Sequence, residues 1–265
     1  MILAFDIGGS NARYAIGTPR DYESYQVTDY DSDMSYTSLL SLLQTIIDQE
    51  NPDKVGVSVP GPIYPPGIVS PSAAPSPNIS IDDAPLQHDL NDRVEPRVAI
   101  QRDLHCAAQG ILHLNDSSTF VLLYPGTGFG YATAYNGDVV TGASNTAGEL
   151  ATAQSPHGSY DDVLCLAAMT RHDSDSRPPM QLLDNMDEVV YQYIERFAHL
   201  TAPLIRTTAP PTVFIGGHLA EYWEDLKQPL VEELQDELPY TPDLRSTEIT
   251  PLVGAFTLGS GNIHF

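Results

Sequence analysis

The stretch MILAFDIGGSNARYAI (residues 1–16) decides the fold that we expect for this chain. Residues 2–6 form a mostly apolar run that is typical of a buried strand, and residues 12–16 alternate as a second strand would. Gly8 and Gly9 stand between the two runs, where glycine favours a tight turn. The chain is therefore predicted to begin with a β-hairpin.

Beyond the hairpin, strand and helix patterns alternate along the chain. We expect strands over residues 22–27, 54–59, 97–100, 119–124, 130–135, 138–140 and 212–215, and helices over 36–49, 103–114, 159–170, 187–205, 218–237 and 252–259. Residues 64–85 hold six prolines and several serines, too many for regular structure, so this stretch is either a disordered linker or a functional loop. The order of elements predicts an α/β protein with two similar halves and a cleft between them.

The chain is strongly acidic. Its 265 residues include 35 Asp and Glu against 12 Lys and Arg, a formal charge of −23, and only two of the cations are lysines, Lys54 and Lys227. Surfaces that bind nucleic acids or anionic membranes need a positive field, so the charge argues against both kinds of partner. Hydrophobic residues make up 42% of the chain, enough for one large or two modest folded domains.

The acidity is spread along the chain rather than gathered in a tail, which indicates an environment more than a partner. In about 1 M salt the Debye length shrinks to about 3 Å, so repulsion among carboxylates is screened. We interpret the chain as a protein of a halophile, and an ordinary acidic mesophilic protein is the alternative. Residues 221–248 carry nine acids against two bases, which is most simply a solvated helix face.

The cysteines and the apolar runs of the sequence indicate in which cellular compartment the protein lies. Cys106 and Cys165 form neither a disulfide framework nor a paired metal-ligand spacing. The N-terminal segment meets Asp6 after four apolar residues, unlike a signal peptide, and no run approaches the roughly 18 apolar residues that a membrane span needs. We therefore expect a soluble, cytoplasmic protein.

Three glycine-rich turns follow predicted strands: DIGGSNAR (6–13), PGTGFG (125–130) and IGGHL (215–219). Glycine lets backbone N–H groups converge on an anion, and an adjacent helix N-terminus or hairpin turn adds oriented dipoles. Such turns are common singly, but three in one chain indicate phosphate binding. None of them matches the phosphate loop that ends in Gly-Lys-Ser/Thr or the dinucleotide fingerprint.

The first turn carries polar groups that suit a nucleotide. Asp6 ends a strand, where its carboxylate is expected to hold a hydrated Mg²⁺, a hard cation that prefers oxygen ligands. Ser10 adds a hydroxyl group and Arg13 a cation near the phosphates. A purely structural interpretation stays open, in which Asp6 caps the turn and Arg13 is an outward strand residue.

A second candidate lies in RDLHCAAQG (102–110), where Asp103 follows a predicted strand and starts a predicted helix. A carboxylate at this point is suited to take the proton from a substrate hydroxyl group. Asp is also a favoured helix N-cap, since it satisfies free backbone N–H groups, and the residues by themselves favour capping.

The order of short motifs along the chain carries a resemblance. These motifs are DIGGSNAR (6–13), VGVSVPGP (55–62), SPNIS (76–80) with APL (84–86), RDLHCAA (102–108), GTGFG (126–130), NTAGE (145–149), FIGG (214–217) and GAFTLG (254–259). In order and spacing the chain resembles the ROK family of sugar kinases and related regulators, within the actin-like ATPase superfamily. The resemblance implies two ribonuclease H-like α/β domains with an active-site cleft between them, residues 1–102 plus 250–265 and residues 103–249.

The resemblance also implies roles for individual residues. Asp103 corresponds to the catalytic base, which deprotonates the sugar hydroxyl group that attacks the γ-phosphoryl group of ATP. The positions that correspond to nucleotide-binding residues are Gly8, Gly9, Ser10, Arg13, Gly126, Thr127, Gly128, Gly216 and Gly217. The positions that correspond to sugar-binding residues are Gly61, Asn78 and Glu149, which makes the proline-rich stretch part of a substrate loop. ATP and Mg²⁺, near Asp6, are the implied cofactors.

The chain departs from the family where the sugar would lie. The family usually has Asn immediately before the catalytic Asp and often Asn two residues after it, where this chain has Arg102 and His105. Arg102 either contacts an anionic group of the substrate or pairs with a nearby acid. His105 and His113 are expected to be packing or surface residues. Thr152 stands where many members have a His, and the cysteine-rich zinc motif is absent, so we expect no structural zinc.

Two functions compete. The first is an ATP-dependent kinase of a sugar or sugar derivative, resembling hexokinases and glucokinases, and the second is a catalytically inactive nucleotide- or sugar-binding regulator. The repressors of the family carry an N-terminal helix-turn-helix, whereas this chain starts at the first phosphate strand and its charge repels DNA, so no nucleic-acid partner is expected. By the same resemblance we expect a homodimer or homotetramer.

Overall fold

The computed structural model describes residues 1–8, 12–27, 34–64, 67–69, 83–171 and 173–259. The chain forms two compact units. The first comprises Met1–Asp116, Asp138–Ala147 and Ile249–Phe265, and the second comprises Ser117–Gly137 and Gly148–Glu248. These units place residues 103–116 with the N-terminal part of the chain, whereas we expected a domain boundary after residue 102. The domain boundaries themselves stay a prediction.

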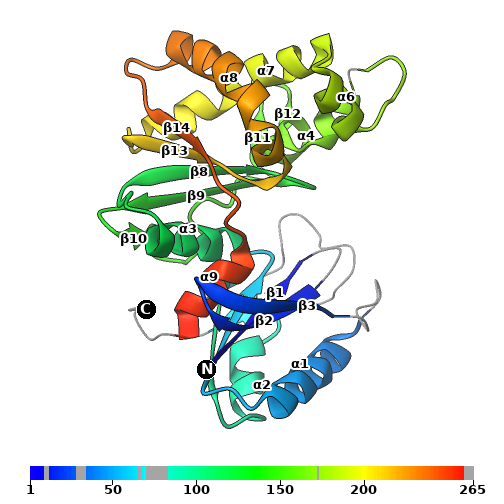
Figure 1. The fold of residues 1–265 in the computed structure, drawn as a ribbon, viewed down its shortest axis with the longest axis vertical. Helices are drawn as coiled ribbons and strands as arrows, with labels where there is room; N and C mark the ends of the chain where they lie inside the picture. Colours follow the sequence, from blue (N-terminus) through cyan, green and yellow to red (C-terminus); the bar gives the residue numbers. More distant parts are fainter. Residues whose placement is uncertain (9–11, 28–33, 65–66, 70–82, 172, 260–265) are drawn as a thin grey trace. The chain divides into compact units, whose positions relative to one another are not determined.

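The first unit is built on a five-stranded sheet with the order β3-β2-β1-β4-β7 (Figure 1). Its strands are β1 (Ile2–Ile7), β2 (Ala12–Thr18), β3 (Asp21–Gln26), β4 (Lys54–Val59) and β7 (Arg97–Arg102). Strands β1, β2 and β3 are antiparallel neighbours, so the predicted hairpin is confirmed. Strands β1, β4 and β7 run parallel, and their carboxyl ends therefore lie at one edge of the sheet.

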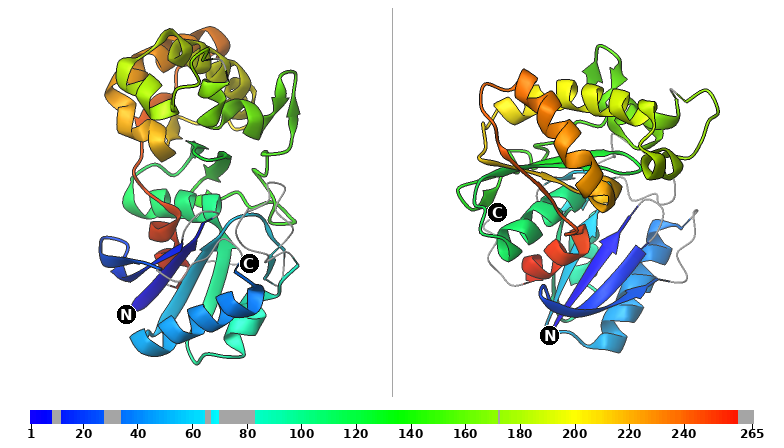
Figure 2. Two further views of the ribbon diagram at one scale, coloured as in Figure 1. Left: turned by 90° about the vertical axis from the view of Figure 1, so that its right-hand side faces the viewer. Right: turned by 45° about the horizontal axis from the view of Figure 1, so that its top comes forward.

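Helices cover both faces of this sheet (Figure 2). They are α1 (Tyr36–Glu50), α2 (Leu86–Asn91), α3 (Asp103–Leu114) and α9 (Pro251–Gly259). The first unit also contains the short strands β5 (Ile63–Tyr64), β6 (Ile68–Val69) and β10 (Asp138–Val139). The apolar stripe of α1 and the buried side of α2 share one core with the central strands. Helix α9 packs on the opposite face, through residues such as Ala255 and Phe256.

Helix α9 approaches its neighbours closely because glycines stand at the contacts. A Cβ atom built on Gly254 of α9 would lie 1.6 Å from the carbonyl oxygen of Cys106 in α3, and one built on Gly56 of β4 would lie 1.8 Å from the carbonyl oxygen of Ala255. Only glycine allows these backbones to come so near. The contacts fix α3, the helix that begins at Asp103, against the C-terminal helix.

The second unit contains the strands β9, β8, β13 and β14 of a five-stranded sheet with the order β10-β9-β8-β13-β14 (Figure 1). Its strands are β8 (Phe120–Pro125), β9 (Phe129–Tyr135), β13 (Thr212–Ile215) and β14 (Asp243–Ser246), with the small hairpin β11 (Gln154–Ser155) and β12 (Gly158–Ser159). Its helices are α4 (Tyr160–Leu164), α5 (Ala167–Thr170), α6 (Pro179–Asn185), α7 (Glu188–Arg206), the 3₁₀ helix η1 (Gly217–Tyr222) and α8 (Trp223–Glu237). Residues of β8 and β13 share one core with these helices. The expected meander of β8, β9 and β10 is confirmed.

Two predicted helices differ in detail from those observed. The helix expected over 159–170 is broken between α4 and α5, because Cys165 adopts an extended conformation and the N–H of Leu166 donates to the carbonyl of Gly126 at 3.1 Å. The helix expected over 218–237 begins as the 3₁₀ helix η1 and becomes α-helical only at Trp223. Within residues 173–259, α6 and β14 were not predicted.

Candidate functional site

The first cluster of predicted site residues lies at the carboxyl ends of β1 and β4. Asp6 is opposite Ser58 in the register of these strands, and the Ser58 hydroxyl donates to Oδ1 of Asp6 at 3.0 Å. Arg13 comes from the partner strand β2 and donates to the other oxygen, Oδ2, from Nε at 3.2 Å and from Nη2 at 3.1 Å. One carboxylate is thus held by a hydroxyl group on one side and a guanidinium on the other.

Burial changes the pKa of the Asp6 carboxyl group. Desolvation raises the pKa of Asp6 above its ordinary value, although the charge of Arg13 and the hydrogen bonds from Ser58 and Arg13 act to lower it. Cys106 of α3 lies close to the cluster: burial raises the pKa of its thiol well above the ordinary value, and the charges of Asp6 and Asp103 raise it further. Both carboxylates therefore lie near one buried thiol.

Asp103 is the first residue of α3 and directly follows β7. Its Oδ1 accepts the backbone N–H of Leu104, the next residue, at 2.7 Å, which is not the hydrogen bond two or three residues along the helix that the capping interpretation expects. The N-cap position itself belongs to Arg102, whose side chain makes no capping hydrogen bond. The Asp103 side chain keeps 30% of its surface exposed, which leaves it accessible to a substrate.

Arg102 and His105 flank Asp103 and are both buried. Nη1 of Arg102 donates to the carbonyl oxygen of Ala147 at 2.8 Å, and Nε2 of His105 lies 3.0 Å from the same oxygen. Nε of Arg102 also lies 3.9 Å from Oδ1 of Asp103, a contact of the kind that the ion-pair interpretation expects. His105 is buried, and His113 is exposed at the far end of the helix, so the burial of both agrees with the expected packing and surface positions.

The second glycine turn connects β8 and β9 in the second unit. Gly126 donates its N–H to the carbonyl of Gly128 at 2.8 Å, and Thr127 between them is exposed. Asp161 of α4 supports the turn, because its Oδ1 accepts the N–H of Phe129 at 2.7 Å. Burial raises the pKa of the Asp161 carboxyl group above its ordinary value. The turn is thus braced by the segment whose predicted helix is interrupted.

The third glycine turn lies beside the second. Strands β8 and β13 are parallel neighbours, so both turns leave the same edge of the sheet. Gly216 donates its N–H to the carbonyl of Leu123 at 2.9 Å, and a Cβ atom on Gly216 would lie 2.4 Å from the ring of Tyr124. Gly217 has a φ of +66°, and a Cβ atom there would lie 2.4 Å from the carbonyl oxygen of Pro125. Backbone contact at this edge therefore requires glycine.

The remaining predicted residues are placed as follows. Gly61 is buried two residues after the end of β4 and has a φ of +84°, and Gly8 directly follows β1. Glu149 is partly buried in the second unit. Gly9, Ser10 and Asn78, which were also expected at the site, lie outside the described residues. The first unit thus brings together Asp6, Gly8, Arg13, Gly61, Arg102 and Asp103, and the second unit brings together Gly126, Thr127, Gly128, Gly216 and Gly217.

Sequence reasoning missed three residues of these clusters. Ser58 lies in VGVSVPGP, and its position opposite Asp6 in the register could have been found by pairing β1 with β4. Cys106 gives no signal in the sequence beyond the absence of a disulfide or metal-ligand spacing. Asp161 had no local signal, because its contact with Phe129 joins positions 32 residues apart.

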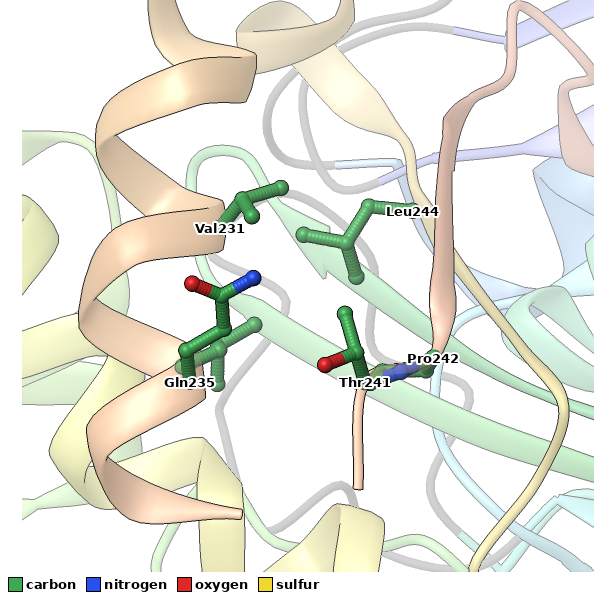
Figure 3. A pocket seen from close by; sticks show the side chains of 6 residues that line it. Val231, Gln235, Thr241, Pro242 and Leu244 are labelled. Atoms are coloured by element: carbon green, nitrogen blue, oxygen red, sulfur yellow. The ribbon is translucent and has the colours of Figure 1, made fainter. Parts of the chain in front are cut away.

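Other features of the described structure do not point to a site. In residues 1–8, 12–27, 34–64, 67–69, 83–171 and 173–259, no group of three or more His, Cys, Asp or Glu side chains is arranged to hold a metal ion. Among the same residues, no helix is long and apolar enough to cross a membrane. A small hollow between α8 and β14 is lined mainly by apolar side chains, and none of the predicted site residues lines it (Figure 3).

The two sheets define the class of the protein. A mixed α/β fold with two five-stranded sheets, as in the solved structures of ROK proteins, is the actin-like ATPase fold, so the predicted fold class is confirmed. The ROK hexokinase from Thermus thermophilus is similar to this chain with a TM-score of 0.78 and 20% identity, over 98% of this chain and 97% of that one. The chain belongs to the ROK family, whose model matches residues 2–160.

Curated relatives agree with this assignment. The chain is 32% identical over 164 residues to the N-acetyl-D-glucosamine kinase of Mannheimia succiniciproducens, an alignment that covers 58% of this chain and 52% of that protein. It is 25% identical over 279 residues to the N-acetyl-D-glucosamine kinase of Escherichia coli O157:H7, covering 90% of this chain and 89% of that protein. In the first of these matches, the chain spans about half the length of its relative.

Proposed function

We propose that this protein is an ATP-dependent kinase of a sugar or a sugar derivative. The observation that carries the proposal is the position of Asp103, which begins α3 at the sheet edge where Asp6 lies next to the last residue of β1. Family membership supports it, as do the relatives named N-acetyl-D-glucosamine kinases, and this amino sugar is therefore the first acceptor to test.

Asp103 is proposed as the general base. Its carboxylate takes the proton of the sugar hydroxyl group while that oxygen forms a bond to the γ-phosphorus of ATP. The bond between the γ-phosphorus and its bridging oxygen breaks, and ADP leaves with the electron pair. Phosphoryl transfer depends mainly on positioning and charge neutralisation, and a positioned base adds about 10²- to 10⁴-fold in rate.

The residues of the first cluster fit a hydrated Mg²⁺. The Asp6 carboxylate and the Ser58 hydroxyl are oxygen donors, and Mg²⁺ in nucleotide sites is bound by one or two carboxylates together with waters and phosphates. A single carboxylate is therefore enough, and no dedicated cage of side chains is required. When bound, Mg²⁺ would neutralise charge on the phosphates. Arg13 and the glycine turns would orient the nucleotide, and Gly61, Asn78 and Glu149 would contact sugar hydroxyl groups.

A coupled assay of ADP release tests this function. The wild-type protein is assayed in molar KCl with Mg²⁺ and ATP against a panel of N-acetyl-D-glucosamine, glucose, mannose and an acidic sugar. We expect sugar-dependent ADP release that Asp103→Asn lowers by at least about a hundredfold in kcat. Asp116→Asn, an exposed acid just past the end of the same helix, is the matched control and should behave as wild type.

Two results would contradict the proposal. If no sugar stimulates ADP release, the kinase fails, and the inactive binding protein becomes the better interpretation. If Asp103→Asn turns over sugar as fast as Asp116→Asn does, Asp103 is not the base. The proposal places the kinase in the cytoplasm of a halophile, on the strength of the charge of −23, and as a homodimer or homotetramer, on the strength of the family.

A further inference from the structure

A single backbone atom accepts from two buried side chains beside the proposed base. The carbonyl oxygen of Ala147 accepts from Nη1 of Arg102 at 2.8 Å and contacts Nε2 of His105 at 3.0 Å. The side chain of Arg102 is 4% exposed and that of His105 is 1% exposed. Both residues belong to the segment that carries Asp103, whereas Ala147 lies more than 40 residues further along the chain.

The contact defines the protonation of the histidine ring. A carbonyl oxygen can only accept, so Nε2 of His105 must carry the proton and donate it to Ala147. Burial, and then the charge of Arg102, lower the pKa of His105 to about 4, so the ring is neutral at neutral pH and has a single N–H group. Nδ1 of the ring has no hydrogen-bond partner among the described residues. The only N–H of His105 is therefore committed to this carbonyl.

Further contacts attach the same loop, residues 141–147, to other residues of the first unit. The side-chain amide of Asn145 donates to Oε1 of Gln101 at 3.1 Å and to the carbonyl of Ile63 at 2.6 Å. The N–H of Ala147 closes the loop by donating to the carbonyl of Thr141 at 3.0 Å. The loop is thus closed on itself and fastened at both Asn145 and Ala147.

The anchor bears on Glu149, the residue proposed to contact the sugar. Glu149 follows Ala147 by two residues, and two residues of chain span at most about 7 Å. Holding the carbonyl of Ala147 on Arg102 and His105 therefore limits how far Glu149 can lie from that atom.

We propose that Arg102 and His105 are positioning residues that fasten the loop 141–147 to the helix of the base and thereby place Glu149 for sugar binding. This inference rests on the proposed kinase function. It gives Arg102 a role other than contact with an acidic substrate, because the guanidinium is buried and bonded to the main chain. Arg102 and His105 then act together, because both donate to the carbonyl oxygen of Ala147.

Hydrogen exchange of backbone amides tests the anchor without any need for activity. In His105→Leu and Arg102→Met, the amides of residues 141–147 should exchange roughly five- to tenfold faster than in wild type, since a hydrogen bond to the loop is lost. His105→Gln keeps an N–H donor of similar reach and should restore exchange to within about twofold of wild type. His113→Leu on the same helix and Arg97→Met on the same strand are exposed, matched controls.

Steady-state kinetics test the effect on the sugar. A misplaced Glu149 should raise the KM for the sugar about tenfold in His105→Leu while the KM for ATP changes by less than about twofold, because uniform binding of one substrate is lost. His105→Gln should recover the sugar KM. A merely structural role would instead lower the amount of folded protein and leave both KM values unchanged.

The exchange rates and the KM values decide whether Arg102 and His105 fasten the loop. It is overturned if exchange in the loop is the same in His105→Leu as in His113→Leu, if exchange increases throughout the protein, or if the sugar KM stays at the wild-type value. Selective loss of activity toward the acidic sugar in Arg102→Met would mark direct substrate contact instead. If Arg102→Met does not fold, Arg102→Lys, which keeps one donor, should give an intermediate exchange rate. Absence of kinase activity in wild type refutes the proposed function alone, and the exchange rates then decide the anchor.

Discussion

Replacing Gly254 by alanine should destabilise the first unit strongly, because it drives a methyl group into the backbone of a neighbouring helix. The Cβ atom of the variant would lie 1.6 Å from the carbonyl oxygen and 2.2 Å from the carbonyl carbon of Cys106. Cβ atoms essentially never lie within 3.0 Å of such atoms, so α9 and α3 would have to separate by about 1.4 Å. Neither atom of Cys106 can move aside as the end of a side chain can.

The magnitude follows from how little α9 can adjust. Strand β4 also touches its backbone, since a Cβ atom on Gly56 would lie 1.8 Å from the carbonyl oxygen of Ala255. Overpacking of a core usually costs about 1–3 kcal/mol, and displacement of helix backbone lies at or above the upper end, so we expect a loss of about 3 kcal/mol or more. For a chain of this size each kcal/mol lowers Tm by about 2–4 °C, which gives a fall of roughly 6–12 °C.

Thermal and urea unfolding in molar KCl measure the effect, with two graded controls. In Gly110→Ala the new Cβ atom meets a methyl group of Ile249 at 2.8 Å, which can rotate away in part, so a loss of about 1–2 kcal/mol is expected. In Gly137→Ala nothing lies within 4 Å, and only the φ of +91° penalises alanine, by about 1 kcal/mol. A Gly254→Ala variant within about 1 kcal/mol of wild type would refute this account of the packing.

Three further predictions concern acid, the second glycine turn and salt. Burial lowers the pKa of His105 from 6.5 to about 4, so between these pH values His105 binds a proton in the unfolded chain but not in the folded chain. The contribution of His105 to the free energy of unfolding is complete above pH 6.5 and falls by up to about 3 kcal/mol toward pH 4. Urea titrations of His105→Gln should lack this fall. Gly128→Ala places a Cβ atom 2.6 Å from Oδ1 of Asp161 and should cost about 1–2 kcal/mol in thermal unfolding, whereas Gly126→Ala, with its nearest described atom at 3.9 Å, should cost less than about 0.5 kcal/mol. Circular dichroism should show a Tm that rises steadily between about 0.1 M and about 1 M KCl, as the Debye length falls from about 10 Å to about 3 Å, and a Tm independent of KCl would contradict a halophilic origin.

Much of the fold was predictable because its signals are local. The helix over 103–114 matches α3, since its apolar positions recur at helical spacing and an acid follows a strand at its start. The first hairpin matches for the same reason, with glycines between two strand patterns. The break at Cys165 was not predictable, because it depends on a hydrogen bond from Leu166 to Gly126, about 40 residues away.

The candidate site also has a part that the sequence predicts and a part that it does not. Asp6 and Asp103 were found because each stands where a predicted strand ends, and parallel strands bring such residues to one edge. The contact of Arg102 and His105 with Ala147 left no signal in the sequence, because a backbone carbonyl has no identity that a motif can record. The residue types at positions 102 and 105 likewise do not indicate that both side chains contact one carbonyl oxygen.

The charge of −23 and the binding of a nucleotide are compatible because they concern different parts of the molecule. Nine of the acids lie between residues 221 and 248, in and around α8, far along the chain from the first cluster. Within that cluster Asp6 is paired with Arg13, so the two formal charges cancel at the point where phosphates are proposed to bind. Arg102 is bonded to the main chain, and neither lysine lies in a glycine turn. The charge of ATP must therefore be met mainly by backbone N–H groups and Mg²⁺, which act over a few ångströms and are little affected by carboxylates beyond the Debye length.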